Sequence, residues 1–534
     1  MNALVIEASE HYGGSSAMSG GVCWVGNNSK ISEAGIPDTD AEALDYLKAI
    51  TKGEIEESRL KAYLENSQRM VTWFESETTL RFDPLVKYTD YYPEEPGGKP
   101  GGRSMESRPF DGTKLGNELQ HLRRPHPQSQ ILGKFGITAA QAHTMLAGGW
   151  RTKLLMMWLV FRYFLRSSKR RRFGRDTDLT CGNALAGRLR HTMLEKDVDL
   201  WLNTPATELI IEGGRVCGAV VTRDGKEIRI RASKGVVLAA GGFSRNQEMR
   251  NKYQRDPIET RWHAGNPYDT GIGIQLGLAA GGTVDLMKEA WWTPVTMVPK
   301  SEFAWVLVVE KNCPGGIFVN KHGNRFCNEA APYIDVVIDM YADNDKTGAT
   351  IPAWLVFDAD FRKKYPVGPI APGYAMPDAA IPRRYRDGKF LYSAPTLAEL
   401  AEKLGVPADT LQATVDRQNG FSKTGVDEDF GRGESASDRY YGDHRVTPNP
   451  NLAPIDSAPF YAIAVYPGDL GTKGGLVVSD GSEVLREDGT AIEGLYACGN
   501  TTASVMGRTY PGAGGTISPA ITYGMLAAET AANT

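Results

Sequence analysis

The chain has 534 residues, a formal net charge of −4 and 41% hydrophobic residues. This length can bury a large core and predicts two or more domains or subdomains. The nearly neutral charge gives no reason to expect a nucleic acid as partner. The six cysteines form no CxxC pair, which argues against a zinc site and a disulfide framework and favours a reducing compartment. We therefore expect a cytoplasmic protein without a bound metal. Its N-terminus, MNALVIE, resembles a strand interior more than a signal peptide.

The first predicted strand, Ala3–Ile6, ends at Glu7, and dinucleotide-binding folds use an acid in this place to bind ribose hydroxyls. The strand and GxGxxG loop that precede such an acid in a Rossmann unit are absent from the printed sequence. We expect either a truncated form or a protein without its pyrophosphate loop, and in both cases a weakly held dinucleotide. The Gly- and Ser-rich stretch His11–Gly21 suits a phosphate or ring system, or else a surface loop.

Apolar residues at helical spacing predict two helices within residues 38–76. A loop follows, marked by the tyrosines of Tyr88–Pro93 and the glycines of Gly97–Arg103. Such a cluster of tyrosines is typical either of a packing patch or of a pocket wall.

Residues 137–176 combine a strongly apolar run, Leu154–Leu165, with many basic residues and no acid between Trp150 and Gly174. The run is too short to span a bilayer, which needs about 20 residues. Aromatic side chains beside a basic cluster favour a helix that lies in an anionic membrane surface, with residues 150–175 as the contact. A core helix or a subunit-contact helix is the alternative.

From Asp197 the pattern is that of strands, with a hairpin at Asp224–Gly225. Gly235–Phe243 is predicted to be a buried strand that ends in Gly-Gly, and Asp269–Gly282 a helix packed on a sheet. Residues 293–467 are richer in loops and prolines, which indicates an inserted domain.

The stretch Gly494–Ala520 begins with a short apolar strand, turns at Gly499–Asn500 and continues to a Gly-rich turn, Tyr510–Thr516. A Gly-rich turn before a helix leaves backbone N–H groups free for an anion or a carbonyl. Tyr510 adds a phenol that can donate a hydrogen bond. The alternative is a buried strand–helix loop in which the glycines serve packing.

Taken together, these stretches resemble the flavoproteins of the fumarate reductase/succinate dehydrogenase superfamily, and within it the 3-ketosteroid Δ1-dehydrogenases. The resemblance rests on the joint order of several motifs from residue 5 to the C-terminus: VIEASEHYGGSSAMSGG, KGVVLAAGGF, Trp291-Trp292, GGIFVNKHGNRFCNEAAPY, GVDEDFGRG, DLGTKGGL and GLYACGN…TYPGAG. The missing first strand and the long 137–176 segment depart from the family pattern.

The resemblance implies an α/β fold with a Rossmann-like FAD-binding domain and an inserted α+β catalytic domain. The expected parts are residues 1–292 and 468–534 for FAD and residues 293–467 for the substrate, with 137–176 as an insert in the first part. The implied reaction is the 1,2-desaturation of a 3-ketosteroid, and the implied cofactor is FAD.

The resemblance also assigns roles to four catalytic residues. Tyr510 and the backbone N–H of Gly514 match the pair that grips the C3 carbonyl. Tyr333 matches the base that removes a proton from C2, and Tyr91 the tyrosine that assists it, while the C1 hydrogen leaves as a hydride to the flavin. These residue types suit the chemistry, because enolate charge needs donors aimed at the oxygen, and a phenol of pKa about 10 needs help to act as a base.

The candidate FAD-binding residues come from the same matched stretches at both ends of the chain and from the strands between them. They are Glu7, Gly13, Gly14, Ser15, Ser16, Ser19, Gly20, Gly21, Ala206, Ala240, Gly241, Gly242, Gly499, Asn500, Gly515, Thr516 and Ile517.

Two other functions stay open. An enoate reductase of the fumarate reductase type, or a C4–C5 ketosteroid dehydrogenase, fits the same fold. A dicarboxylate clamp needs basic side chains, for which Arg325, His322, Arg383, Arg384 and His444 are available, although none lies in a stretch that matches such a clamp. A flavin-less, membrane-associated sterol-binding protein is the third hypothesis.

The partners expected for the dehydrogenase are a hydrophobic 3-ketosteroid, for example a sterol-derived ketone, and an external electron acceptor of the quinone or dye type. Residues 150–175 are expected to bind the anionic inner face of the cell membrane. Whether the protein forms a homo-oligomer is left open.

Overall fold

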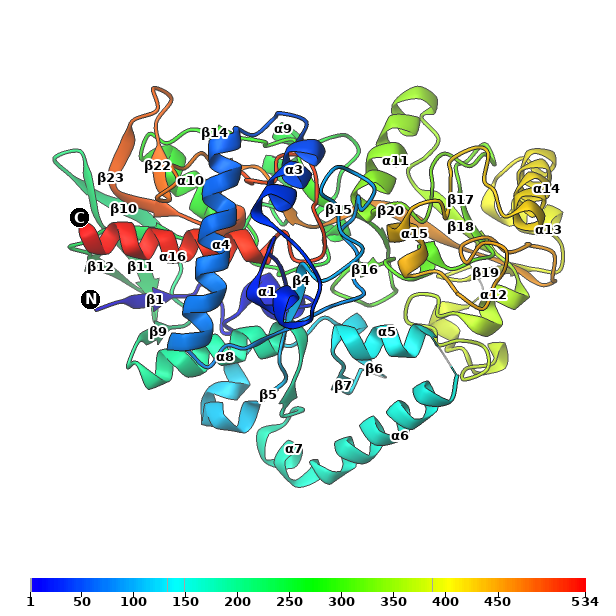
Figure 1. The fold of residues 1–534 in the computed structure, drawn as a ribbon, viewed down its shortest axis with the longest axis horizontal. Coiled ribbons are helices and arrows are strands. Elements are labelled where there is room, and N and C mark those ends of the chain that lie inside the picture. The colour runs from blue at the N-terminus through cyan, green and yellow to red at the C-terminus, as the bar shows by residue number, and fades with distance from the viewer. Residues whose placement is uncertain (1, 132, 148, 387) are drawn as a thin grey trace.

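The computed structural model describes residues 2–131, 133–147, 149–386 and 388–534, and both ends of the chain lie in the same half of the molecule (Figure 1). Parallel strands from distant parts of the sequence form the base of this half. β1 (Leu4–Ile6) pairs with β9 (Asp199–Trp201), and β13 (Val236–Leu238) pairs with β23 (Ala491–Ala497), which continues antiparallel to β22 (Glu483–Leu485). The α/β part is therefore assembled from both chain ends.

Strand β13 is shorter and less buried than the sequence predicts. The run Gly235–Phe243 is expected to be a buried strand, but only Val236–Leu238 is extended, and Val237 is 40% exposed. Among the described residues, β13 lies at the edge of its sheet, which explains the exposure. Leu238 is buried and packs in one core with Leu495 and Ala497 of β23.

An antiparallel layer lies next to these strands. β11 (Arg215–Arg223) and β12 (Lys226–Arg231) form the hairpin predicted at Asp224–Gly225, and β10 (Ala206–Glu212) pairs with the other edge of β11. Helix α10 (Ile272–Ala279), also predicted, shares a core with β10, β11 and β23.

The other half of the molecule is built on a larger antiparallel sheet with the strand order β16-β15-β20-β18-β17. Its strands are β15 (Ala290–Thr296), β16 (Trp305–Val306), β17 (Gly316–Val319), β18 (Ala353–Phe357), β19 (Tyr392–Ala394), which also pairs with β20, and β20 (Phe460–Thr472). The expected domain limits at residues 293 and 467 fall inside β15 and β20, so these two strands pass from one half into the other.

Four helices cover this sheet at its far end (Figure 1): α11 (Tyr333–Thr347), α12 (Ala359–Lys364), α13 (Leu397–Leu404) and α14 (Ala408–Thr424). α13 and α14 pack on the face that carries Ile317, Val356 and Ala462. The short α15 (Ala436–Tyr440) lies between this cover and the middle of the molecule.

Long helices brace the middle of the molecule. The two helices predicted within residues 38–76 are α3 (Asp40–Thr51) and α4 (Glu57–Glu77), and α4 crosses the C-terminal helix α16 (Ile517–Asn533). The Tyr63 hydroxyl lies 2.9 Å from the Ser518 hydroxyl, and the Arg69 guanidinium lies 2.7 Å from the Glu529 carboxylate. These contacts join the beginning and the end of the chain.

The remaining helices and strands are short, apart from the 15-residue α8. The helices are α1 (Gly14–Met18), α2 (Ser29–Glu33), α8 (Cys181–Glu195) and α9 (Gln247–Tyr253). The strands are β2 (Val22–Trp24), β3 (Phe82–Pro84), β4 (Ser104–Ser107), β5 (Phe110–Asp111), β6 (Gln130–Ile131), β7 (Phe135–Gly136), β8 (Asp178–Leu179), β14 (Val284–Asp285) and β21 (Gly475–Leu476).

The predicted apolar–basic insert forms α5 (Ala139–Ala147), α6 (Gly149–Leu165) and α7 (Ser167–Phe173), and α6 and α7 stand out from the body as an arm (Figure 1). Large side chains on α6 are exposed at helical spacing: Trp150, Leu154, Met157, Trp158, Phe161, Phe164 and Leu165. Because only Leu159 of α6 is fully buried, α6 is not a core helix.

The basic cluster is less free than the sequence suggests. Arg162 and Arg166 contact Asp178, and Lys169 contacts Asp111. Arg175 is only 7% exposed, because its guanidinium donates hydrogen bonds to backbone carbonyls and to Asn183. Arg151, Lys153, Lys169, Arg171 and Arg172 are the members of this cluster that are exposed, Lys169 in spite of its contact with Asp111. Within the described part of the chain, no helix is long and apolar enough to cross a membrane.

Candidate active site

Three tyrosines from separate segments meet between the two halves of the molecule. Tyr91 lies in the loop after β3, Tyr333 is the first residue of α11, and Tyr510 lies in the loop before α16. Their exposed fractions are 6%, 8% and 4%, and all three belong to the same hydrophobic core. The three tyrosines to which the family resemblance assigns catalytic roles thus lie together at one buried point.

The tyrosine hydroxyls and rings contact one another directly. The Tyr91 hydroxyl donates a hydrogen bond of 2.9 Å to the Tyr333 hydroxyl. The ring centroids are 5.3 Å apart for Tyr91 and Tyr333, 5.2 Å for Tyr91 and Tyr510, and 5.5 Å for Tyr333 and Tyr510, each pair edge to face. This packing fixes all three rings with little conformational freedom.

Burial raises the pKa of Tyr333 well above 10, and the neighbouring Tyr510 and Tyr88 add to the increase. The hydrogen bond from Tyr91 acts in the opposite direction and lowers the pKa of Tyr333, because it stabilises the phenolate. Burial also raises the pKa of Tyr91 and of Tyr510. In the pair, Tyr91 is thus the donor and Tyr333 the acceptor that can carry a negative charge.

Gly514 brings its backbone toward Tyr510. Burial raises the pKa of Tyr510, and hydrogen bonding with Thr516, Tyr333 and the Gly514 N–H opposes the increase. A Cβ at Gly514 would lie 2.6 Å from the Cys23 backbone, and its φ is +99°. The glycine therefore also permits close packing on β2, as the alternative interpretation of this loop expected.

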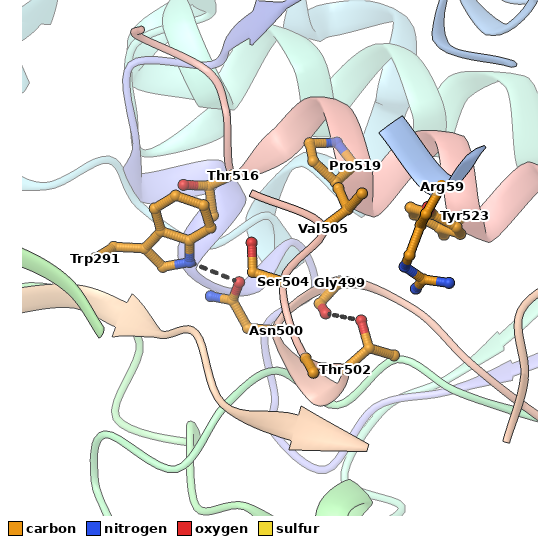
Figure 2. A pocket seen from close by; sticks show the side chains of 11 residues that line it. Arg59, Trp291, Gly499, Asn500, Thr502, Ser504, Val505, Thr516, Pro519 and Tyr523 are labelled. Carbon is orange, nitrogen blue, oxygen red and sulfur yellow. Dashed lines mark hydrogen bonds between the residues drawn. The ribbon is translucent and has the colours of Figure 1, made fainter. Parts of the chain in front are cut away.

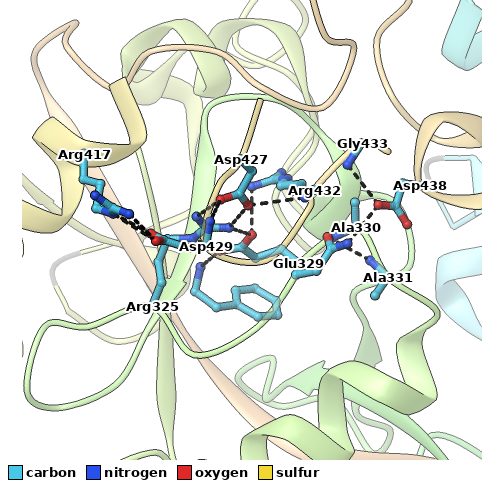
Figure 3. A network of polar contacts seen from close by, with 12 residues as sticks. Arg325, Glu329, Ala330, Ala331, Arg417, Asp427, Asp429, Arg432, Gly433 and Asp438 are labelled. Atoms are coloured by element: carbon cyan, nitrogen blue, oxygen red, sulfur yellow. Dashed lines mark hydrogen bonds and ion pairs between the residues drawn. The ribbon is translucent and has the colours of Figure 1, made fainter. Parts of the chain in front are cut away.

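A buried network of charges holds the loop that carries Tyr333 (Figure 3). Glu329 is fully buried and accepts hydrogen bonds from Arg325 at 2.8 Å and from Arg432 at 3.1 Å. The Lys311 ammonium donates to the Glu329 carbonyl at 3.0 Å and to the Ala331 carbonyl at 2.5 Å. Asp438 accepts from the Asn328 side chain at 2.9 Å. Tyr333 comes two residues after Ala331, so this network of hydrogen bonds and ion pairs supports its position.

The candidate residues for FAD lie at both chain ends and in or after the strands β10 and β13. Glu7 is at the end of β1, where its carboxylate accepts from the Ser9 N–H at 2.9 Å. Gly13, Gly14, Ser15 and Ser16 lie at or in α1, followed by Ser19, Gly20 and Gly21 before β2. Ala206 opens β10, and Ala240, Gly241 and Gly242 follow β13. Gly499, Asn500, Gly515 and Thr516 lie between β23 and α16, and Ile517 is the first residue of α16.

The structure joins some of these segments through His263, which the sequence did not indicate. Its Nδ1 lies 2.8 Å from Asp469 and its Nε2 lies 3.2 Å from Asp269, while the Ser15 hydroxyl donates to Asp269 at 2.7 Å. Burial lowers the pKa of His263, but the two carboxylates outweigh this and raise the pKa above its ordinary value. Helix α1 is thus tied through Asp269 and His263 to Asp469 of β20.

A small cavity of about 20 Å³ lies at the other group of candidates (Figure 2). Asn500 and Thr516 line it, and the Trp291 Nε1–H donates to the Asn500 side chain at 3.1 Å. Trp291 also packs on Tyr510, with ring centroids 4.6 Å apart. The cavity therefore links the predicted cofactor residues to the tyrosine cluster.

These surroundings fit FAD. Buried Asn266 has an Oδ1 without a hydrogen-bond partner, and its N–H donates to Ser15 at 2.8 Å, so an unsatisfied polar atom lies at the predicted cofactor loop. The 17-residue helix α16 begins directly after Thr516, whose side chain accepts no capping hydrogen bond from the first turn of the helix. The N-terminus of such a helix offers free N–H groups and a positive dipole end to a polar ligand.

The sequence analysis missed an aromatic group beside the three tyrosines. Tyr88 and Tyr441 share a hydrogen bond of 2.7 Å between their hydroxyls, and the His143 ring stacks on Tyr440 at 4.7 Å. Tyr88 belongs to the predicted loop Tyr88–Pro93, whereas the pair Tyr440-Tyr441 lies in none of the motifs matched in the sequence.

The basic residues considered for a dicarboxylate clamp do not meet at the tyrosines. Arg325 is bound to Glu329 and Asp427 in the network of Figure 3. His322, Arg383, Arg384 and His444 are exposed. Among the described residues, these five side chains form no shared anion site.

Comparisons with known proteins agree with this geometry. The family model described as FAD binding domain matches residues 1–517. A 3-oxosteroid 1-dehydrogenase of Mycobacterium tuberculosis (strain ATCC 25618 / H37Rv) is 42% identical, and the alignment covers 99% of this chain and 93% of that protein. The 3-oxosteroid 1-dehydrogenase of Comamonas testosteroni is 35% identical, with 99% and 91% covered.

The crystal structure of 3-ketosteroid delta1-dehydrogenase from Sterolibacterium denitrificans in complex with 1,4-androstadiene-3,17-dione is also similar to this chain. It superposes with a TM-score of 0.96 at 44% identity, covering 100% of this chain and 95% of that chain.

Proposed function

This chain belongs to the 3-oxosteroid 1-dehydrogenases of the FAD-binding family, and we propose that Tyr91, Tyr333, Tyr510 and Gly514 carry out its reaction. It is an FAD-dependent oxidoreductase that desaturates the C1–C2 bond of 3-ketosteroids. The observation that supports these residue roles best is the hydrogen bond of 2.9 Å from Tyr91 to Tyr333, beside Tyr510.

FAD, when bound, supplies the oxidant that accepts the hydrogen of C1 as a hydride. The residues that would hold it are the candidates around α1, after β13, and between β23 and α16, with Glu7 at the ribose. Ser15, fixed by Asp269, and Asn500, fixed by Trp291, have the best-defined side chains among them.

Tyr510 and the Gly514 N–H bind the C3 carbonyl oxygen. As the proton leaves C2, negative charge develops on this oxygen, and two fixed donors in a buried site stabilise it strongly. Their contribution grows toward the transition state, so it raises the rate rather than only the affinity.

Tyr333 removes the proton from C2. In its ionised form the phenolate oxygen accepts that proton, and the Tyr91 O–H donates to the same oxygen, which makes the ionised form accessible. The buried network under Ala331–Tyr333 holds the phenol in place, since a misplacement of about 1 Å can cost a factor of about 100 in rate.

The test is product analysis with purified, flavin-loaded protein, a 3-keto-Δ4-steroid and an artificial electron acceptor. We expect a 1,4-diene and a slower reaction with substrate deuterated at C1 or C2. Oxidation at C4–C5 of a saturated ketosteroid, or reduction of fumarate by a reduced dye, would instead favour one of the alternative reactions. A protein without flavin absorbance would favour the sterol-binding hypothesis.

We further propose that α6 and α7 dock the enzyme on an anionic membrane, as a peripheral protein on the inner face of the cell membrane. Seven large apolar side chains of α6 are exposed on one arm, and burial of apolar area contributes about 25 cal/mol per Å². Exposed Arg151, Lys153, Arg171 and Arg172 each add about 1 kcal/mol near an anionic surface.

Membrane docking would give the active site direct access to steroids that dissolve in the bilayer. A sterol-derived ketone with a long side chain partitions there, and so does a quinone, which we propose as the external acceptor that reoxidises the flavin. A second copy of the chain on the same apolar face is the competing occupant, and the vesicle experiment in the Discussion separates the two.

A further inference from the structure

Lys473 is a lysine in an unusual place, directly after β20 in the interior of the molecule. Lys473 is only 1% exposed, and lysines are almost never fully buried unless they are paired. The ammonium donates to the carbonyl of Gly507 at 3.1 Å and to the carbonyl of Thr509. Thr509 precedes Tyr510, so the ammonium holds the peptide that enters the catalytic tyrosine.

The same ammonium also contacts Trp291, and the Trp291 ring packs on Tyr510. The Lys473 Nζ lies 4.2 Å from the Trp291 ring centroid, a distance at which a desolvated cation–π contact is favourable. The Trp291 ring in turn packs on the Tyr510 ring, with the centroids 4.6 Å apart, and its Nε1–H donates to the Asn500 side chain at 3.1 Å. Lys473 therefore fixes Tyr510 from two sides, through the backbone and through Trp291.

Burial in this place is costly. It lowers the pKa of Lys473 to about 7, although Glu289, Asp335 and Glu54 oppose the decrease. A methionine of similar length would fill the same space without a charge to desolvate. Packing alone thus does not explain why an ammonium lies here.

We propose that Lys473 is a positioning residue for Tyr510, which keeps the phenol aimed at the substrate's C3 oxygen. The inference rests on the proposed role of Tyr510 as a donor to that oxygen. Without the ammonium, the carbonyls of Gly507 and Thr509 lose the hydrogen bonds that Lys473 donates, and Trp291 loses the cation on its face. The Tyr510 hydroxyl then shifts relative to the Gly514 N–H, and the two donors no longer converge.

The test is a double-mutant cycle between Lys473→Met and Tyr510→Phe in the flavin-loaded enzyme. We expect Lys473→Met to lower kcat by about 10- to 100-fold with a smaller change in KM, because a donor displaced by about 1 Å stabilises the transition state poorly. In the Tyr510→Phe background, the same substitution should cost less than about threefold, since no hydroxyl remains to position.

The cycle separates the two proposals. If Tyr510→Phe alone leaves kcat unchanged, the proposed role of Tyr510 is wrong. If Tyr510→Phe lowers kcat but Lys473→Met costs the same factor in both backgrounds, Lys473 does not act through Tyr510 and the positioning role is overturned. Lys321→Met removes an exposed lysine that also donates to a carbonyl, and it should leave kcat unchanged.

Folding is checked by flavin content and by the thermal midpoint of each variant. If Lys473→Met does not bind flavin, the cycle is run with Lys473→Gln, whose amide can still donate to the Thr509 carbonyl but carries no charge. An equal loss in both backgrounds would again overturn the inference.

Discussion

The hydroxyl of Tyr91 donates a 2.9 Å hydrogen bond to the hydroxyl of Tyr333, across 242 positions of sequence. The direction of this bond distinguishes the two phenols. Tyr333 is the acceptor, and an accepted hydrogen bond stabilises the negative charge that a base carries before it takes a proton. Tyr91 has no equivalent donor in the pair, so it assists and Tyr333 reacts.

The first prediction concerns Tyr91→Phe. Hydrogen bonds to charged groups contribute about 1.5–3 kcal/mol, so removing the hydroxyl should lower kcat about 10- to 100-fold at neutral pH. Steady-state kinetics with a 3-ketosteroid and a dye acceptor measure this. Tyr374→Phe is the matched control, because Tyr374 is 77% exposed, and it should be without effect. Wild-type kcat in Tyr91→Phe would contradict the assisting role.

The second prediction concerns the pH dependence of the rate. The pKa of Tyr333 is raised well above 10, chiefly by burial, so at neutral pH the phenol is almost entirely protonated. As long as the pH stays below that pKa, each increase of one pH unit raises the fraction of reactive phenolate about tenfold. We expect log kcat to rise with pH from 7 to about 9 where proton abstraction limits the rate, and Tyr333→Phe to abolish both the rise and most of the activity.

This profile is measured under single-turnover conditions, by flavin bleaching at several pH values. Tyr91→Phe should shift the rising limb to higher pH, since its hydrogen bond lowers the pKa of Tyr333. A rate that is flat between pH 7 and 9 would count against a tyrosine base.

Periodic elements and matched motifs were predictable from the sequence, whereas isolated buried charges were not. Helices α3 and α4 and the hairpin at Asp224–Gly225 follow from spacing and turn residues, which are local properties. The meeting of Tyr91, Tyr333 and Tyr510 depended on family motifs, because their contacts span hundreds of residues. His263 carried no signal, and Lys473 lies in the matched motif DLGTKGGL but was given no role, since only their partners in space show what these side chains do. Arg175 was misread as a surface charge for the same reason.

The third prediction concerns Gly514→Ala. Its Cβ would lie 2.6 Å from the Cys23 backbone at a φ of +99°, so the loop must move or strain. We expect lower thermal stability, by about 1–3 kcal/mol, and lower kcat because the Gly514 N–H moves. Gly524→Ala on α16 is the control: its nearest contact would be 3.7 Å from Cys498, and it should stabilise by about 0.5–1 kcal/mol. Equal midpoints for the two variants would contradict this account.

The fourth prediction concerns Glu329 in the buried network of charges before Tyr333. Burial alone would raise the pKa of Glu329, but Arg325 and Arg432 outweigh it and hold the pKa below its ordinary value. A depressed carboxylate pKa contributes stability above the unfolded pKa, and this contribution is lost as the pH falls through the folded value. Glu329→Gln should therefore destabilise the protein by about 3–5 kcal/mol at pH 7, with a smaller difference from wild type below about pH 4.

Thermal unfolding between pH 3 and pH 8 measures this difference. Glu428→Gln, at an exposed acid of the neighbouring loop, is the matched control and should unfold like the wild type at every pH. A difference between Glu329→Gln and wild type that stays constant down to pH 3 would show that the carboxylate charge is not what stabilises the network.

The fifth prediction concerns the arm formed by α6 and α7. We replace Trp158, Phe161 and Phe164 together by serine, because these side chains are 53%, 56% and 64% exposed on α6 and their loss removes no core packing. The variant should lose most of its flotation with anionic vesicles, while kcat with a short-tailed ketosteroid in detergent-free buffer stays unchanged. Trp73→Ser is the control, since Trp73 is also 43% exposed but lies on α4.

Vesicle charge and mass measurement then identify what covers the arm. Binding to an anionic membrane through both apolar and basic residues should weaken with salt and with neutral lipid, because the electrostatic part is screened beyond about 10 Å at 0.1 M salt. A second copy of the chain would instead give a wild-type dimer that the serine variant converts to a monomer, with equal flotation for both. That outcome would replace the membrane with a subunit interface and remove the proposed route by which long-tailed ketosteroids reach Tyr510.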